Sequence, residues 1–238
     1  TIFIILSSTN NNNNNNNNIE YREIFGVTLA QKVNTEKVND SYFDNIPTTR
    51  NDLPEHKQED LILATTTLKY TPSNSIVISN GNQVIGVGAG QQNRVDCIKI
   101  AGSKALIFSM RFHPKCIDLL DKFKEEVKRQ DKVNAIIKYI HNDFLPNELV
   151  RWRDLFIDPD SIELFTDEEK KLFQSDLNDL CLSSDAFFPF RDNIDYAQRY
   201  GVSYILNPGG SIQDENIIEA CNEYNILMAI SGKRMFYH

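Results

Sequence analysis

The stretch "GVSYILNPGGSIQDENIIEACNEYNILMAI" (residues 201–230) has the pattern of a β-α-β unit. Its ends, "GVSYILN" and "YNILMAI", are short apolar segments typical of strands, whereas "DENIIEACNEY" between them has helical spacing. A helical crossover joins parallel strands, so this stretch predicts an α/β fold whose last two strands are parallel. The turn "NPGGS" (residues 207–211) follows the first strand, at the sheet edge where α/β proteins usually bind ligands.

The upstream sequence predicts a hairpin and further helices. Residues 74–90, "NSIVISNGNQVIGVGAG", alternate like two strands that turn at Asn80-Gly81. Thr166 stands three residues before Glu169, which is the capping-box signature of a helix start. Apolar residues recur at helical spacing in four other segments: residues 59–71, 94–110, 116–130 and 133–144.

The first 18 residues differ from the rest. "TIFIIL" (residues 1–6) is too short to span a bilayer and lacks the features of a signal peptide, so it is predicted to be a buried strand. The asparagine run at residues 10–18 has too little apolar surface to fold, which predicts a disordered loop. The chain begins with Thr1, which suggests a fragment. We therefore expect a strand and loop in residues 1–18 and a domain in residues 19–238.

Composition narrows the classes of function. The chain has 238 residues, 41% of them hydrophobic, which is enough for a substantial core. A net charge of −8 without a long Lys/Arg run argues against binding to nucleic acid or an anionic membrane. Its four cysteines and four histidines are scattered, without metal-ligand spacing. We expect a cytosolic protein with reduced thiols and no zinc site.

The glycine-rich segment "IGVGAGQQNR" (residues 85–94) has two interpretations. Gln91 occupies the position of the last glycine in G-x-G-x-x-G, and the segment follows a hairpin, so a dinucleotide site is disfavoured. Either the glycines let a helix pack closely, or they let the backbone approach a ligand with Arg94 directed at an anion. By themselves, Asn74 in "YTPSNS" is typical of a turn and Arg234 of a solvated charge.

The segment "SSDAFFPFRDN" (residues 183–193) also has two interpretations. Its three phenylalanines can form a packed aromatic corner, with Asp192 capping a helix that begins near Asn193. Alternatively, they can form a stacking surface for a flat heterocycle whose ring nitrogens donate to the Asp192 carboxylate. Composition does not decide between these alternatives.

Five motifs in unbroken order resemble one enzyme family: "KYTPSNS" (69–75), "QVIGVGAGQQNRVDCIKIAGSKA" (83–105), "SSDAFFPFRDNID" (183–195), "NPGGSIQDENIIEAC" (207–221) and "RMFYH" (234–238). This is the bifunctional family that combines AICAR (phosphoribosylaminoimidazolecarboxamide) formyltransferase with IMP cyclohydrolase in purine biosynthesis. The resemblance covers nearly the whole chain, from about residue 19. It implies a cytidine-deaminase-like three-layer α/β/α subdomain without zinc, and a cytosolic homodimer whose active sites are shared between subunits.

The resemblance also implies a reaction and site residues. The family moves a formyl group from 10-formyltetrahydrofolate, its co-substrate, to the 5-amino group of AICAR, and no metal is required for the chemistry. By match to the family's motifs, the residues that would contact AICAR are Asn74, Arg94, Phe187 and Arg234. Those that would hold the folate are Val95, Asp192, Ser211 and Ile212.

The chain departs from the family at the catalytic base. The family's proton acceptor is a histidine in a Lys-His pair, and this sequence contains no Lys-His dipeptide. We expect that pair and the cyclohydrolase domain to lie upstream, so that this chain has part of a site, no catalytic residue and no activity alone. The alternative is a non-catalytic folate- or nucleotide-binding remnant or regulatory subunit. A third and weaker hypothesis is a Rossmann-type oxidoreductase.

Overall fold

The computed structural model describes residues 3–5 and 19–235, which belong to two compact units, Thr1–Asn39 and Asp40–His238. The first unit is a three-stranded antiparallel sheet of order β1-β3-β2, formed by β1 (Phe3–Ile5), β2 (Ile19–Ile24) and β3 (Val27–Lys32). The predicted strand in "TIFIIL" is confirmed for Phe3–Ile5. The asparagine run lies outside the described residues, and the boundary after residue 18 stays a prediction.

The second unit is built on a five-stranded mixed sheet of order β5-β4-β6-β7-β8. β4 is antiparallel to both neighbours, whereas β6, β7 and β8 are parallel. The predicted hairpin and β-α-β unit are thereby confirmed. The strands are β4 (Ser75–Asn80), β5 (Gln83–Ala89), β6 (Leu180–Ser184), β7 (Val202–Asn207) and β8 (Leu227–Ile230).

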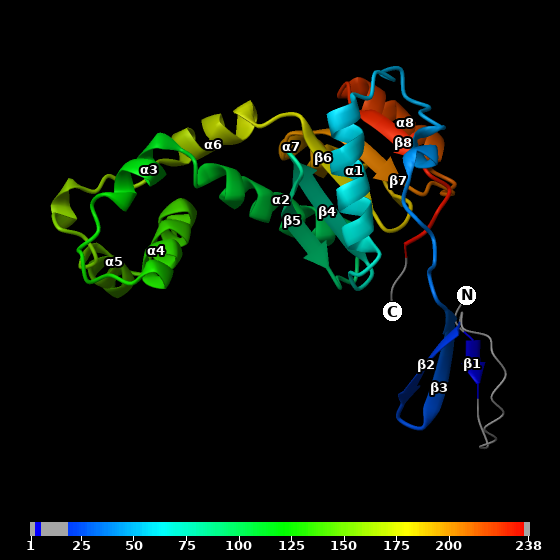
Figure 1. The fold of residues 1–238 in the computed structure, drawn as a ribbon. Coiled ribbons are helices and arrows are strands. Elements are labelled where there is room, and N and C mark those ends of the chain that lie inside the picture. The colour runs from blue at the N-terminus through cyan, green and yellow to red at the C-terminus, as the bar shows by residue number, and fades with distance from the viewer. Residues whose placement is uncertain (1–2, 6–18, 236–238) are drawn as a thin grey trace. The chain divides into compact units, whose positions relative to one another are not determined.

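Helices cover both faces of this sheet. α1 lies across one face, and α2, α7 and α8 pack on the other, which gives three layers (Figure 1). A second group, α3 to α6 with η2, lies in the connection between α2 and β6 (Figure 1). The helices are η1 (Asp40–Phe43), α1 (Glu55–Leu68), α2 (Arg94–Met110), α3 (Pro114–Leu120), α4 (Arg129–His141), α5 (Pro146–Arg153), η2 (Pro159–Ser161), α6 (Asp167–Asp176), α7 (Asp192–Arg199) and α8 (Asp214–Glu223).

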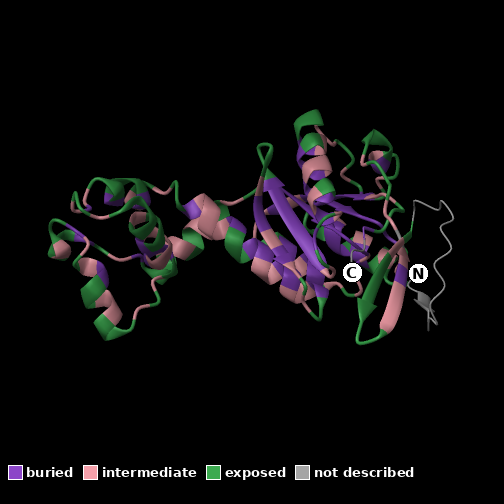
Figure 2. Ribbon diagram, turned by 60° about the horizontal axis from the view of Figure 1, so that its bottom comes forward, coloured by how far each residue is buried: buried purple, intermediate pink, exposed green. Residues whose placement is uncertain are grey.

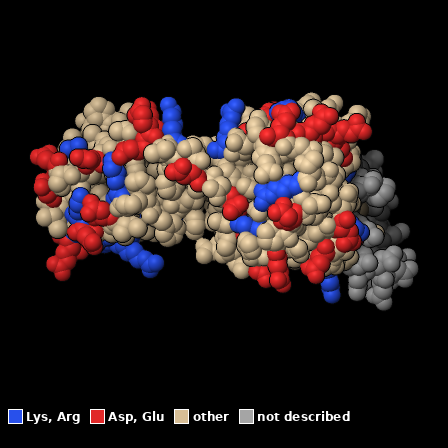
Figure 3. Space-filling model, turned by 90° about the horizontal axis from the view of Figure 1, so that it is seen from above, with Lys and Arg blue, Asp and Glu red and all other residues tan. Residues whose placement is uncertain are grey.

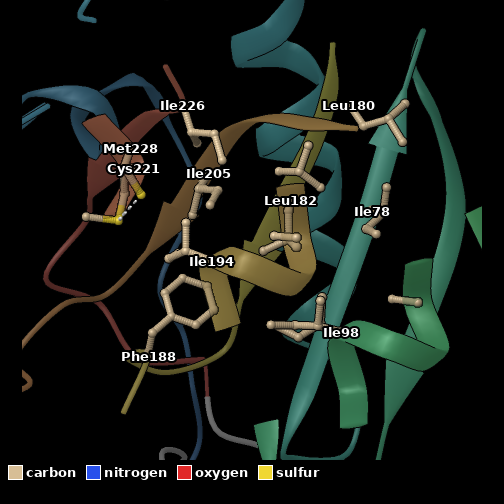
Figure 4. Packing of buried hydrophobic residues seen from close by; sticks show 14 of the residues in the cluster. Ile78, Ile98, Leu180, Leu182, Phe188, Ile194, Ile205, Cys221, Ile226 and Met228 are labelled. Carbon is tan, nitrogen blue, oxygen red and sulfur yellow. Dashed lines mark hydrogen bonds between the residues drawn. The ribbon is translucent and has the colours of Figure 1, made fainter. Parts of the chain in front are cut away.

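The main core lies between the sheet and the layer of α2, α7 and α8. Ile78 of β4, Leu182 of β6 and Ile205 of β7 meet Ile98 of α2 and Ile194 of α7 there, all fully buried (Figure 4). Period-two alternation along the strands directs these side chains to one face. The central strands are accordingly buried along most of their length (Figure 2).

The opposite face, under α1, carries buried polar side chains. Ser79 Oγ donates to the Asp60 carbonyl (2.8 Å), and Thr65 Oγ1 donates to Ser183 Oγ (3.0 Å). The Asp60 carboxylate accepts from the backbone N–H of Gly81 (3.1 Å) and Asn82 (2.6 Å) in the hairpin turn. These buried groups are therefore satisfied by specific partners that fix α1 on the sheet.

Two glycines of β5 let α2 pack closely. A Cβ at Gly86 would lie 2.1 Å from the Ala101 carbonyl oxygen, and one at Gly88 would lie 2.0 Å from that of Cys97. Any larger residue would push α2 away from the sheet. The close-packing interpretation of the glycine-rich segment is thus confirmed for these two positions.

The α3–α6 segment has its own core, and here one predicted helix is wrong. Residues 116–130 do not form a continuous helix, because α3 ends at Leu120 and α4 begins at Arg129. Between them, Lys124 N donates to the Leu155 carbonyl (3.0 Å), while the rings of Phe123 and Phe156 pack with centroids 4.5 Å apart. This tertiary pairing outweighs the local helical periodicity.

The capping box predicted at the start of α6 is confirmed. Thr166 N donates to Glu169 Oε2 (2.8 Å), and Glu169 N donates to Thr166 Oγ1 (3.1 Å). A side-chain hydrogen bond from Lys115 lowers the pKa of Glu169. Two backbone donors at this end of the helix are therefore satisfied by side chains.

The second unit protects its β8 edge. Ile230 N donates to the Asn45 carbonyl (2.8 Å), and Met228 N donates to Thr48 Oγ1 (3.0 Å), so the segment before α1 covers this strand.

Acidic and basic side chains are interspersed on the face seen in Figure 3. In the described part of the chain, no helix combines the length and apolarity needed to cross a membrane.

Candidate functional site

A cavity of about 320 Å³ opens beside the first residue of α2 and the loop that follows β6. Such a volume is at the lower end of the range of small-molecule sites. Five predicted contact residues line it: Asn74, Arg94, Val95, Phe187 and Asp192. They come from the residue before β4, the N-terminal turn of α2, the loop after β6 and the first residue of α7. The fold thus brings together residues that are far apart in the sequence.

Arg94 is the buried charge of this cavity. Its side chain is only 5% exposed and forms an ion pair with Asp185, which is fully buried. Arg94 Nη1 also donates to Ser184 Oγ (2.9 Å), and Nη2 donates to Asn74 Oδ1 (2.9 Å). The guanidinium is therefore compensated by the protein and held in one orientation, instead of lying free in solvent.

The Asn74 amide is oriented from both ends. Its Oδ1 accepts from Arg94, while its Nδ2 donates to the Gln91 carbonyl (3.1 Å). The Asn74 carbonyl accepts from Gly90 N (2.9 Å) and from the Cys97 thiol (3.1 Å), whose pKa is raised by burial. The peptide bond between Ser73 and Asn74 is cis. A side-chain amide has two donor hydrogens and two lone pairs, so Asn74 keeps capacity for a ligand.

The three phenylalanines of "SSDAFFPFRDN" have different surroundings. Phe188 is 1% exposed and belongs to the main core, as the packed-corner interpretation requires. Phe187 is half-buried and Phe190 is 66% exposed, and both line the cavity. The packed-corner interpretation is thus confirmed for Phe188, whereas the stacking surface stays a prediction for Phe187 and Phe190.

Arg234 lies beside the cavity without lining it. Its guanidinium carbon is 5.3 Å from the centroid of the Phe187 ring, within the range of a cation–π contact. The next residue, Met235, donates its N–H to the Asp185 carbonyl (2.9 Å). This bond holds the C-terminal segment next to the loop after β6.

The packed-corner interpretation is wrong about Asp192, which does not cap α7. The helix begins at Asp192 itself, and its N-cap is Arg191, whose side chain makes no capping hydrogen bond. The Asp192 carboxylate accepts from Asn193 Nδ2 (2.9 Å) and remains exposed. A carboxylate in the first turn is favoured by the helix dipole and has further lone pairs for a donor.

The structure does not bring the other two predicted folate residues to this cavity. Ser211 Oγ accepts from Gln213 N (3.1 Å) in the turn before α8, and the Ile212 side chain is fully exposed. Gly209 and Gly210 in the same turn have φ values of 66° and 90°, which favour glycine.

Sequence reasoning missed two buried polar residues of the site, Asp185 and Asn193. Within the described residues, Asp185 Oδ2 and Asn193 Oδ1 are buried and have no hydrogen-bond partner. Both residues stand inside the "SSDAFFPFRDN" motif, which was the available signal. No group of three or more His, Cys, Asp or Glu side chains able to hold a metal ion occurs among residues 3–5 and 19–235.

Comparison with known proteins finds similarity to proteins of purine biosynthesis. The family model of the AICARFT/IMPCHase bienzyme matches residues 2–104. Curated relatives include the bifunctional purine biosynthesis protein PurH of Buchnera aphidicola, 30% identical over 221 residues, and that of Persephonella marina, 28% identical over 221 residues. Each alignment covers 92% of this chain but only 29% of the relative.

The PurH protein of Aquifex aeolicus is 28% identical over 190 residues, which are 80% of this chain and 25% of the relative. The chain therefore spans less than a third of the length of these relatives. The family resemblance carried by the five motifs is confirmed, and the chain is related to the bifunctional PurH proteins along most of its length.

Proposed function

We propose that this chain supplies the AICAR- and folate-binding part of an AICAR formyltransferase active site. One observation carries the proposal. Five residues predicted from family motifs, contributed by four separate segments, line a single cavity. Two of them, Asn74 and Arg94, are held in place by hydrogen bonds before any ligand is present, as a preorganised site requires.

The residues suit the two substrates chemically. The flat imidazole ring of AICAR would stack on Phe187, and the Asn74 amide would pair with polar groups on its edge. Arg94, through its remaining N–H groups, and Arg234 would meet the anionic and polar groups of the nucleotide. Val95 and Asp192 would meet the folate, the latter by accepting hydrogen bonds from its ring nitrogens. Ser211 and Ile212 would take part only if the folate extends beyond the cavity.

In the proposed reaction, the C–N bond between the formyl carbon and N10 of the folate breaks. A new C–N bond forms to the 5-amino nitrogen of AICAR, which loses a proton to a base, while N10 takes up a proton and tetrahydrofolate leaves. The amine is a weak nucleophile because its lone pair is conjugated with the ring, so a base is needed. The chain contains no Lys-His pair, and we propose that it binds both substrates but does not turn them over alone.

The missing pair also supports a second candidate, a non-catalytic folate- or nucleotide-binding subunit. The two candidates differ in whether a Lys-His segment completes the site.

We further propose the cytidine-deaminase-like form of the α/β fold, a homodimer that shares its active sites, and a cytosolic location. A mixed five-stranded sheet between two helical layers supports the first of these.

Formyl transfer tests the function directly. The purified chain is incubated with AICAR and 10-formyltetrahydrofolate, alone and with a separately expressed Lys-His segment, and tetrahydrofolate release is followed. Turnover only in the mixture supports the enzyme. Turnover by the chain alone would refute the missing-base account, and binding without turnover in the mixture would favour the non-catalytic candidate. Light scattering tests the dimer, which a strict monomer at micromolar concentration would contradict.

A further inference from the structure

Arg191 links the cavity wall to a distant helix. It stands between Phe190 and Asp192, both of which line the cavity, while its own side chain points to α8. Arg191 Nη1 donates to Glu223 Oε1 (2.8 Å), and Nη2 contacts the other oxygen, Oε2. Two parallel contacts of this kind fix a guanidinium and a carboxylate in both distance and orientation.

Two more residues complete the network. Arg191 Nε lies 3.4 Å from Asp195 Oδ1, one turn along α7, and the Arg191 guanidinium carbon is 5.9 Å from the centroid of the Tyr224 ring. Tyr224 OH donates to Asp195 Oδ1 (3.0 Å). The hydrogen bonds between Arg191 and Glu223 raise the pKa of the arginine and lower that of the glutamate. Both partners are thus charged over the neutral range.

The side chains on either side of Arg191 are not part of the core, although Phe188 and Ile194 of the same segment are buried in it. Phe190 is 66% exposed, and Asp192 is exposed. The Asn193 amide contacts both, through the Phe190 carbonyl (2.8 Å) and the Asp192 carboxylate, but it belongs to the same segment. The contact with Glu223 spans 32 residues and joins this segment to α8.

We infer that Arg191 and Glu223 form a positioning pair that sets where Phe190 and Asp192 stand at the folate side of the cavity. The inference rests on the proposed function, because it assigns these two residues to folate. Neither member of the pair needs to touch a substrate. Isolated surface ion pairs contribute little, but bidentate geometry within a network is the recognised exception.

A double-mutant cycle tests the pair. The variants are Arg191→Gln, Glu223→Gln and the double variant, and dissociation constants for tetrahydrofolate and for AICAR are measured by calorimetry. We expect each single change to weaken tetrahydrofolate binding by about 3- to 10-fold and AICAR binding by less than about 2-fold. The double variant should bind tetrahydrofolate at least as tightly as the single variant with the lower affinity, because the two residues act as a unit.

Matched controls make the same charge changes elsewhere on the two helices. Arg199→Gln on α7 and Glu219→Gln on α8 remove exposed charges that do not line the cavity, and they should leave both affinities unchanged. Salt gives a second readout. The side chains of Arg191 and Glu223 are 34% and 56% exposed, so salt screens their interaction. The difference in tetrahydrofolate affinity between the unsubstituted chain and Arg191→Gln should therefore narrow at high ionic strength.

The outcomes separate this inference from the proposed function. Unchanged tetrahydrofolate affinity in both single variants overturns the positioning pair but leaves the function standing. Equal losses for both ligands, together with a lower unfolding midpoint, would show a merely structural role and also overturn it. If the unsubstituted chain binds neither ligand, the proposed function fails, and the positioning pair fails with it.

Discussion

The two walls of the cavity hold their charges in opposite ways. On the buried wall, Asn74 and Arg94 line the cavity, and Arg94 forms an ion pair with Asp185 that is removed from water, with side chains 5% and 0% exposed. On the open wall, Phe190 and Asp192 line the cavity, and Arg191 between them forms its ion pair with Glu223 at the surface, with side chains 34% and 56% exposed. The first wall is fixed from within the fold, whereas the second depends on a contact that solvent can reach.

This difference has a physical consequence. The two charges of a buried ion pair interact strongly. If one of them is removed, the other is left as an uncompensated charge in a low-dielectric site. An exposed pair is screened, and each partner can return to water at small cost. The buried wall should therefore behave as part of the folding core, and the open wall as an adjustable surface.

Removing the buried carboxylate should have the largest effect. Asp185→Leu leaves the Arg94 guanidinium buried without its partner, and we expect the free energy of unfolding to fall by about 3–5 kcal/mol. Urea denaturation measures the loss. The double variant Asp185→Leu/Arg94→Met removes both charges and should recover part of it. A loss below about 1 kcal/mol for the single variant would show that this wall is not held by charge.

The second prediction concerns the helix that carries Arg94. Gly88→Ala would place a Cβ 2.0 Å from the Cys97 carbonyl oxygen, so α2 must shift, at an expected cost of about 1–3 kcal/mol. The shift should also weaken AICAR binding by moving Arg94. Gly90→Ala is the control for backbone strain alone, because a Cβ there meets nothing within 4 Å although φ is +66°. Equal effects of the two changes on AICAR binding would contradict the steric explanation.

The third prediction concerns stacking on Phe187. Phe187→Leu keeps an apolar side chain but removes the ring, and we expect AICAR binding to weaken by about 0.5–1.5 kcal/mol. The chain should stay folded, since Phe187 is only half-buried. Phe112→Leu makes the same change at a side chain that is 66% exposed and outside the cavity. If both variants bind AICAR like the unsubstituted chain, the ring of Phe187 has no stacking role.

Local patterns predicted the elements whose contacts are local. The Asn80-Gly81 turn joins β4 and β5 as expected, and α2 spans Arg94–Met110 as its apolar spacing indicated. The predicted helix at residues 116–130 failed because the Phe123–Phe156 pairing lies outside any local window. Periodicity reports what a segment prefers alone, not which partner it meets.

The candidate site shows the same division. Family motifs predicted five residues that do line the cavity, including Arg94 and Phe187. They did not predict Asp185, because its role depends on an ion pair with a residue 91 positions away. Nor did they predict Glu223, which lies outside the five family motifs and reaches Arg191 only through the packing of α7 and α8. Residues that act through a partner become visible only in the fold.

The smallest effect is the pH response of the open wall. Hydrogen bonds from Arg191 lower the pKa of Glu223 below its ordinary value of 4.5 in the folded chain. A group with a lowered folded pKa contributes stability that is present above its unfolded pKa and is lost as pH falls through the folded value. The urea midpoints of Glu223→Gln and the unsubstituted chain should therefore differ at neutral pH and converge in acid. A Glu223→Gln difference that persists or grows in acid would mean that the carboxylate is not stabilised by Arg191, and the contrast between the two walls would then lose its electrostatic basis.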